Sequence, residues 1–252
     1  MTKLERITLN NVKSITGSAF RGCRGLNEII ATNSNSFRVI DGALYQISAS
    51  NRLTLIKVPS ARSYKDRSLE IDPSTTAINE YALENLYQLN YLKLPHSINI
   101  LENTIVGNNS LWIDFNESRV PSGINTANNK INIIDNTKLY KFIGDLVYLV
   151  DVENGSNEAT LIYVNSLAVG NIEIASSIII NDISYDVKKI SDNVFNGIKG
   201  INSIYVPASV DVYYNSFRWL QNERVKLLFE ASSIDIWNSE AGYHIEYNYN
   251  IN

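Results

Sequence analysis

A nine-residue phrase recurs along the chain, with its apolar positions at fixed spacing. It reads Val-Lys-Ser-Ile-Thr-Gly-Ser-Ala-Phe at 12–20 and Val-Lys-Lys-Ile-Ser-Asp-Asn-Val-Phe at 187–195. Three further copies are less complete, but every copy keeps an aliphatic residue five positions before a large apolar one. The pairs are Ile15 and Phe20, Ile78 and Leu83, Ile100 and Ile105, Ile190 and Phe195, and Val212 and Phe217. Two pairs of copies are 22 residues apart, the pair at 78 and 100 and the pair at 190 and 212. A period of about twenty residues is typical of a solenoid, in which each unit buries its apolar face only against its neighbours.

Each repeat unit is predicted to begin with a short strand. Residues 89–95 and 201–207 share the order apolar-x-x-apolar-x-apolar-Pro. Leu92 and Leu94 fall on one face of such a strand, and Lys93 on the other. Pro95 and Pro207 end the strands because proline cannot donate to the ladder. The turn after the phrase leaves room for one short helical turn, and no segment carries a long helical pattern. We therefore predict a mainly β repeat solenoid with short parallel strands and few short helical turns.

Two inserted β-hairpin segments interrupt the repeats. Residues 37–58 alternate around the pair Asp41-Gly42, which is a strong signal for a hairpin turn. Residues 138–187 do the same around Gly144-Asp145 and add further strands, with a turn at Asn181-Asp182. The insertions predict two half-arrays that together form one continuous solenoid. The predicted first half spans 1–135, with repeats at 69–116 and a linker at 117–135 that begins in the polar stretch 116–129. The predicted second half spans 136–252, with repeats at 187–236 and a terminal strand at 243–251.

The order of the repeat resembles the BspA-type leucine-rich repeat, whose unit runs Leu-x-x-Ile-x-Ile-Pro-x-x-Val-x-x-Ile-Gly-x-x-Ala-Phe-x-x-Cys-x-x-Leu. Residues 15–26 match its second half, including Cys23, and residues 204–212 match its first. Residues 40–45 are similar to the Asp-Gly-x-Leu-Tyr hairpin often placed between such repeats. The chain departs from the pattern at Leu83 and Ile105, where Phe is expected, and in its later units, which lack Cys. The resemblance implies a right-handed leucine-rich-repeat array in a bacterial surface or secreted protein, often adhesive toward host proteins.

Composition and charge exclude several classes of protein. The net charge is −4, and the densest basic stretch, 62–67, is interrupted by uncharged and acidic residues, so we expect no nucleic-acid binding. No run approaches the ~20 apolar residues of a membrane-spanning helix, so we expect no membrane insertion. No N-terminal apolar run marks a signal peptide. The chain is therefore expected to be either cytosolic or a mature fragment, and the resemblance favours an extracellular or cell-surface location.

Candidate chemical residues are few and isolated. Cys23 is the one cysteine and occupies the Cys position of the repeat, so we interpret it as a packing residue. His96 and His244 lie far apart in sequence and form no evident constellation. The stretch 151–155 is interpreted as a hairpin loop rather than a calcium site, because it lacks alternating oxygen ligands and a distal Glu. We expect no catalytic residue, no metal, no cofactor and no enzymatic activity.

The outward face of the stacked strands is the candidate binding site. Aligning the units places Tyr91, Trp112 and Ser203 in one column, with Lys226 as its extension, and Lys93, Asp114 and Tyr205 in the next. Aromatic rings flanked by charges favour protein binding, because rings bury much area at low entropic cost. The alternative is that these side chains stabilise the sheet through cross-strand pairs. The predicted partner-binding residues are Tyr91, Lys93, Trp112, Asp114 and Tyr205.

Three classes of function follow from these observations. The first is a non-enzymatic ligand-recognition or adhesion module that binds a protein partner, such as a host extracellular protein, through the strand face. The second is a structural spacer or self-assembling scaffold, suggested by exposed strand edges. The third, least favoured, is a carbohydrate-active enzyme built on paired carboxylates. The identity of the partner and the oligomeric state stay open at this point.

Overall fold

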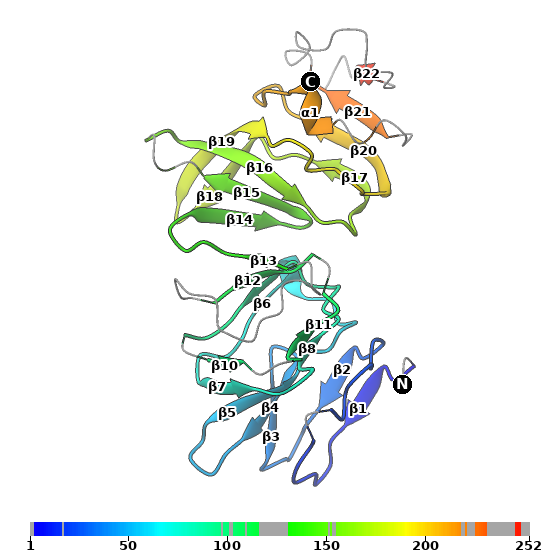
Figure 1. Ribbon diagram of the computed structural model, residues 1–252, viewed down its shortest axis with the longest axis vertical. Helices are drawn as coiled ribbons and strands as arrows, with labels where there is room; N and C mark the ends of the chain where they lie inside the picture. Colours follow the sequence, from blue (N-terminus) through cyan, green and yellow to red (C-terminus); the bar gives the residue numbers. More distant parts are fainter. Residues whose placement is uncertain are drawn as a thin grey trace. The chain divides into compact units, whose positions relative to one another are not determined.

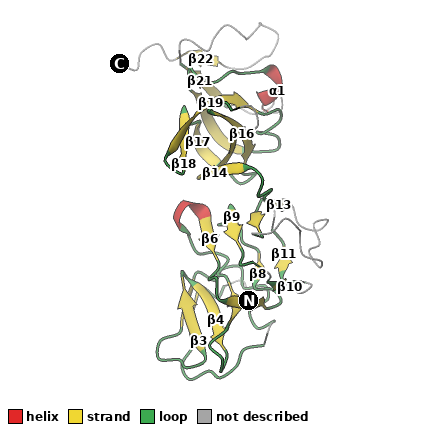
Figure 2. Ribbon diagram, turned by 90° about the vertical axis from the view of Figure 1, so that its left-hand side faces the viewer, coloured by secondary structure: helices red, strands yellow, loops and turns green. Residues whose placement is uncertain are grey.

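The computed structural model describes residues 3–16, 18–96, 98–100, 103–108, 110–115, 131–150, 152, 155–217, 220, 225–230 and 245–247. Nearly all regular structure in these residues is β (Figure 1), which confirms the predicted mainly β class with very little helix. The helices of the described residues are a single 3₁₀ turn, η1 (Lys65–Arg67), and one helical turn, α1 (Tyr214–Phe217), both drawn in red in Figure 2. The chain divides into two compact units, Met1–Asn136 and Thr137–Asn252.

The first unit begins with a parallel pair and an antiparallel meander. The pair is β1 (Arg6–Thr8) and β2 (Glu28–Ile30). The meander is β3 (Phe37–Ile40), β4 (Ala43–Ile47) and β5 (Leu53–Lys57). The β3–β4 turn is Asp41-Gly42, with both residues at positive φ (50° and 86°). A two-residue hairpin of this kind requires positive φ, and glycine adopts it without a steric penalty.

Parallel ladders follow the meander. β5 pairs with β7 (Thr75–Ile78), which pairs with β10 (Asn99–Ile100). A second ladder has the order β13-β12-β9-β6, formed by β6 (Ser68–Glu70), β9 (Tyr91–Lys93), β12 (Trp112–Asp114) and β13 (Asn132–Ile133). A third joins β8 (Leu83–Glu84) to β11 (Ile105–Val106). The register sets Ile78 beside Ile100 and Leu83 beside Ile105, so residues 22 apart in the chain are neighbours across the ladders.

The second unit repeats this order of elements. Its meander is β14 (Leu139–Ile143), β15 (Leu146–Val150) and β16 (Glu158–Val164). β16 runs parallel to β19 (Ile183–Ile190), which forms a hairpin with β18 (Ser177–Ile180). The parallel ladder is β17 (Val169–Glu173), β20 (Gly200–Val206), β21 (Lys226–Phe229) and β22 (Ile245–Tyr247). Each unit therefore combines antiparallel hairpins with parallel repeat strands.

The sheets are mixed rather than uniformly parallel, so the single continuous solenoid stays a prediction. Residues 116–130 of the predicted linker region lie outside the described residues, as does the predicted terminal strand apart from β22. The predicted linker at 117–135 is wrong at its end, because Asn132–Ile133 form strand β13, which pairs with β12. The repeated phrase lies in the core. Ile78, Leu83, Ile190, Phe195, Val212 and Phe217 are each at most 2% exposed. These positions recur in sequence because each must fill the same place in the interior of a unit.

Candidate ligand-binding surfaces

Four of the five predicted binding residues come together on the parallel ladder of the first unit. In register, Tyr91 lies beside Trp112 and Lys93 lies beside Asp114, with Ser68 and Glu70 of β6 on the other side of β9. The alternation along β9 explains the placement, because Leu92 is fully buried and its two neighbours point the opposite way. The ladder thus presents aromatic, cationic and anionic side chains side by side.

Two cross-strand contacts organise this ladder. The Lys93 Nζ atom lies 2.9 Å from Oε1 of Glu70, and both side chains are partly exposed. The Tyr91 hydroxyl donates to Oδ2 of Asp114 over 2.9 Å. Burial, with the hydrogen bond to Asp114 as a second cause, raises the pKa of the Tyr91 hydroxyl above its usual range. Tyr91 therefore stays a protonated donor that is held against the Asp114 carboxylate.

Trp112 and Asp114 are not exposed as the sequence suggested. They are only 8% and 9% exposed, so the expectation that both lie open on the surface is wrong. All three residues of β12 are buried, whereas Tyr91 and Lys93 of the neighbouring β9 are partly exposed, so strand alternation alone does not set exposure on this ladder. On the described ladder, the accessible part of the predicted set consists of Tyr91 and Lys93, with Asp114 holding Tyr91 in place.

Tyr205, the fifth predicted residue, lies in the second unit. On β20 it lies in register with Glu173 of β17 and Leu228 of β21. Its hydroxyl donates to Oε1 of Glu230, whose Oε2 accepts from the Ala208 backbone N–H over 2.7 Å. The hydrogen bond with Glu230 raises the pKa of Tyr205 to about 12 and lowers the pKa of Glu230. The residues predicted to share columns therefore lie on two separate ladders, one in each unit. Ser203 and Lys226 pair with each other on the ladder of the second unit.

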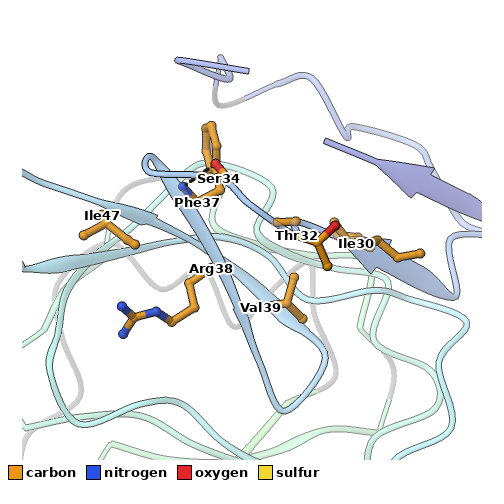
Figure 3. Close-up of a pocket in the computed structure, with 9 residues that line it drawn as sticks. Ile30, Thr32, Ser34, Phe37, Arg38, Val39 and Ile47 are labelled. Carbon is orange, nitrogen blue, oxygen red and sulfur yellow. Dashed lines mark hydrogen bonds between the residues drawn. The ribbon is translucent and has the colours of Figure 1, made fainter. Parts of the chain in front are cut away.

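An apolar pocket of about 400 Å³ lies between β2 and β3, shown in Figure 3. Its walls come from β2, the connection to β3, β3 itself and Ile47 of β4. Arg38 supplies the one charged side chain of the lining, and the Ser34 Oγ atom accepts from the Phe37 backbone N–H over 3.0 Å. This pocket was not predicted from the sequence, because its shape depends on how the hairpin insertion packs against the preceding repeat.

A second, polar pocket of about 310 Å³ lies at the open edge of β6. It is lined by Asp41, Arg62, Ser63, Tyr64, Lys65, Ser68, Leu69 and Glu70. The basic stretch 62–67 was interpreted only with respect to nucleic-acid binding, and a pocket at this place was not predicted. The available signal was a basic stretch that includes Tyr64 and immediately precedes a strand. The contribution of Asp41 comes from the β3–β4 turn and has no signal in the local sequence.

Other candidate chemical groups lie apart. Cys23 is buried in a cluster with Phe20, Leu26 and Ile29, and His96 is exposed. His244 and most of the loop at 151–155 lie outside the described residues. Within the described part of the chain, no group of three or more His, Cys, Asp or Glu residues is arranged to hold a metal ion. No helix there is long and apolar enough to cross a membrane.

Comparison with known proteins identifies the repeat. A family model described as a BspA type leucine rich repeat region matches in six copies over residues 1–111, 60–142 and 152–236. No curated protein matches the sequence. A leucine rich cell surface protein from Faecalibacterium prausnitzii is 19% identical over 98% of this chain and 48% of its own, with a TM-score of 0.41.

The pneumococcal vaccine antigen PcpA is 17% identical, with 98% of this chain and 56% of its own covered and a TM-score of 0.34. The chain thus spans about half the length of the solved proteins it matches.

Proposed function

The chain belongs to the BspA-type leucine-rich repeat family, and from this premise we propose that it is a non-enzymatic ligand-recognition module of a bacterial surface or secreted protein. Its role is adhesion to a protein partner, such as an extracellular protein of a host. The name of the F. prausnitzii protein, a cell surface protein, agrees with this location. Repeat folds of this kind present extended surfaces that suit large partners rather than small substrates.

The exposed part of the first unit's ladder carries the proposal. Tyr91 and the Lys93–Glu70 pair provide an amphipathic ring beside one cation and one anion. Tyrosine is enriched at the centre of protein interfaces, where its ring buries area, and charged pairs such as Lys93–Glu70 suit the polar rim, where they set specificity. The buried Asp114 contributes by holding the Tyr91 hydroxyl, which reduces the entropy lost when a partner orders the ring.

Binding to immobilised extracellular matrix and serum proteins tests this function. We expect Tyr91→Ala combined with Lys93→Ala to weaken capture by about tenfold or more, the loss typical of interface hot-spot residues. Tyr213→Ala is the matched control, because Tyr213 is an exposed tyrosine of the second unit. Tyr205→Ala tests the second ladder separately. Unchanged binding by the double variant, with intact thermal unfolding, would remove this face from the proposal.

Self-association is a second candidate, favoured by apolar side chains exposed on the second unit. Val169 is 71% exposed, Ile179 60%, Ile183 49% and Leu167 48%. In the β18–β19 hairpin Ile179 pairs with Ser184 and Ile183 with Ile180, so the two exposed isoleucines lie on opposite faces of the hairpin. As a scaffold, the chain would dimerise with an affinity that Ile179→Lys abolishes. Sedimentation over a wide concentration range decides, and a strict monomer excludes this role.

A further inference from the structure

We propose that the polar pocket at the edge of β6 binds the carboxylate of an acidic sugar residue. The pocket lies between the Asp41-Gly42 turn, the loop at 62–65 and β6, and its volume is about 310 Å³. Pockets of this size are at the lower end of those that hold small molecules, which suits one sugar unit. Arg62 is the group that would receive the carboxylate. The pocket adjoins the Tyr91 surface, with which it shares Ser68 and Glu70 of β6, and its ligand goes beyond the proposed protein recognition.

The Arg62 guanidinium is held in position by two neighbours. It lies over the Tyr64 ring, 5.8 Å from the ring centroid. On another side it packs against Gly42, where a Cβ atom would overlap its Nε atom. Burial raises the pKa of Tyr64, so the ring stays neutral and attracts the cation through its face. A guanidinium that is already ordered loses less entropy when it binds an anion.

No carboxylate neutralises this guanidinium. Among the residues that the structure describes, Arg62 forms no ion pair, although Asp41 and Glu70 line the same pocket. Glu70 is instead paired with Lys93. A half-buried arginine in a pocket retains its planar fork of donors for a ligand carboxylate, which it can bind through two parallel hydrogen bonds.

A second cation lies on a distorted loop beside Arg62. Lys65 lines the pocket and forms no ion pair within the described part of the chain. The next two residues, Asp66 and Arg67, both have left-handed backbone, with φ of 51° and 52°. The loop thus brings a second positive charge to the lining that Arg62 provides.

The anions in the lining select the class of ligand. Asp41 and Glu70 repel a second negative charge but accept hydrogen bonds from hydroxyl groups. The Ser63 and Ser68 side chains add two hydroxyls to the lining. A ligand with one carboxylate and several hydroxyls satisfies both kinds of group. Inorganic phosphate and polysulfated chains satisfy only the cations, so an acidic sugar fits the pocket best.

Binding of D-glucuronic acid, with D-glucose as the neutral sugar of the same ring, tests the assignment by NMR titration of the whole chain. An array of sialylated and matched asialo-glycans extends the comparison to larger ligands. We expect binding of the acidic member of each pair and, for Arg62→Ala, affinity about tenfold or more weaker, as for loss of a charge-assisted hydrogen bond. Arg62→Lys should not restore it, because lysine lacks the bidentate fork. Arg52→Ala is the control, since Arg52 is an exposed arginine that lines neither pocket.

Several results would overturn the assignment. They are equal binding of glucuronate and glucose, unchanged glucuronate affinity in a folded Arg62→Ala variant, and equal competition by inorganic sulfate, which would indicate a general anion site. Absence of any acidic-sugar binding would do the same. The single variant Tyr91→Ala separates the two proposals, because Tyr91 does not line the pocket and its loss leaves the Lys93–Glu70 pair in place. It should retain glucuronate binding while losing protein capture, so failure of one proposal leaves the other standing.

Discussion

Phe195 stacks on Phe217 in the core of the second unit, with ring centroids 5.2 Å apart and planes inclined by 10°. The two residues are 22 positions apart and occupy the same place in the repeated phrase. Phe217 also meets Phe229 edge to face, at 6.4 Å and 84°. All three rings are at most 2% exposed. The last position of the phrase therefore builds an aromatic column that joins successive repeats.

Truncation of this column should destabilise the second unit strongly. We expect Phe217→Ala to lower the free energy of unfolding by about 3–5 kcal/mol, since it removes a fully buried ring and its contacts with two others. Phe217→Leu should cost less, because the first unit places Leu83 and Ile105 at the equivalent position. Urea unfolding measures both, and a double-mutant cycle with Phe195→Leu isolates the stacking energy. A loss below about 1 kcal/mol for Phe217→Ala would show that the column is not a main support.

Glu84 should support a buried lysine. Lys57 is fully buried, and its Nζ atom donates to the backbone oxygen of Tyr81 over 3.0 Å and lies 4.0 Å from Oε2 of Glu84. The same Glu84 oxygen accepts from the Gly22 N–H over 2.8 Å, which ties the N-terminal repeat to this pair. We expect Glu84→Ala to destabilise the chain by about 3–5 kcal/mol, because it leaves a buried charge without its partner.

Lys57→Met removes that charge instead and should cost less than Glu84→Ala. Urea unfolding of the two variants compares the two losses directly. The reverse order would contradict the proposed dependence of Lys57 on Glu84.

Stability should pass through a maximum as the pH rises. Burial lowers the pKa of Lys57 from 10.5 to about 8. Between these values the unfolded chain holds a proton that the folded chain has released, so stability rises with pH. Burial raises the pKa of Tyr45 and Tyr148 from 10.0 to about 12. Above pH 10 the unfolded chain therefore loses protons that the folded chain retains, and stability falls.

The midpoint of urea unfolding, measured at about pH 7, 9 and 11.5, gives this dependence of stability on pH. Lys57→Met should flatten the rise below about pH 10 and leave the fall above it. A profile that declines steadily from neutral pH would contradict the assignment to Lys57.

Asn108 should stabilise the fold, because the oxygen and the nitrogen of its side-chain amide both form hydrogen bonds with backbone groups of the neighbouring repeat. Its Oδ1 atom accepts from the Leu86 N–H over 2.6 Å, and its Nδ2 atom donates to the Leu83 oxygen over 2.8 Å. We expect Asn108→Ala to cost about 2–4 kcal/mol, since two buried backbone groups lose their partner. Asn108→Asp keeps the acceptor and should still destabilise, because it loses the donor. Asn10→Ala, an exposed control, should change stability by less than about 0.5 kcal/mol.

Gly107 should tolerate no side chain. Its φ is +71°, and an added Cβ would lie 2.5 Å from Oδ1 of Asn85, which itself has left-handed backbone at φ 55°. Gly107→Ala is expected to cost at least about 1 kcal/mol, from backbone strain and from displacement of the Asn85 side chain. Gly22→Ala is the comparison, because Gly22 has a similar φ of +72° but open space around its Cβ position. Equal losses in thermal unfolding would mean that backbone strain alone accounts for the effect.

The candidate binding surface was predictable in register but not in burial. The two-residue period of a strand and the repeat order are enough to set Tyr91 beside Trp112 and Lys93 beside Asp114. The same reasoning placed Trp112 on the solvent side, because alternation along a strand separates its two faces but does not show which face the rest of the fold buries. The polar pocket was missed for a related reason, since Asp41 and Arg62 come from different elements.

What the sequence by itself determined is the repeat: its family, its mainly β class and the buried positions of its phrase. These follow from local periodicity, because a residue that recurs every 22 positions must meet an equivalent residue in the next unit. Only the tertiary structure decided that Trp112 is covered, that Lys57 is buried beside Glu84, and that Arg62 lines a pocket and forms no ion pair with any described residue. Burial and pairing depend on which distant segments arrive beside a residue, and no local pattern of apolar and polar positions records that.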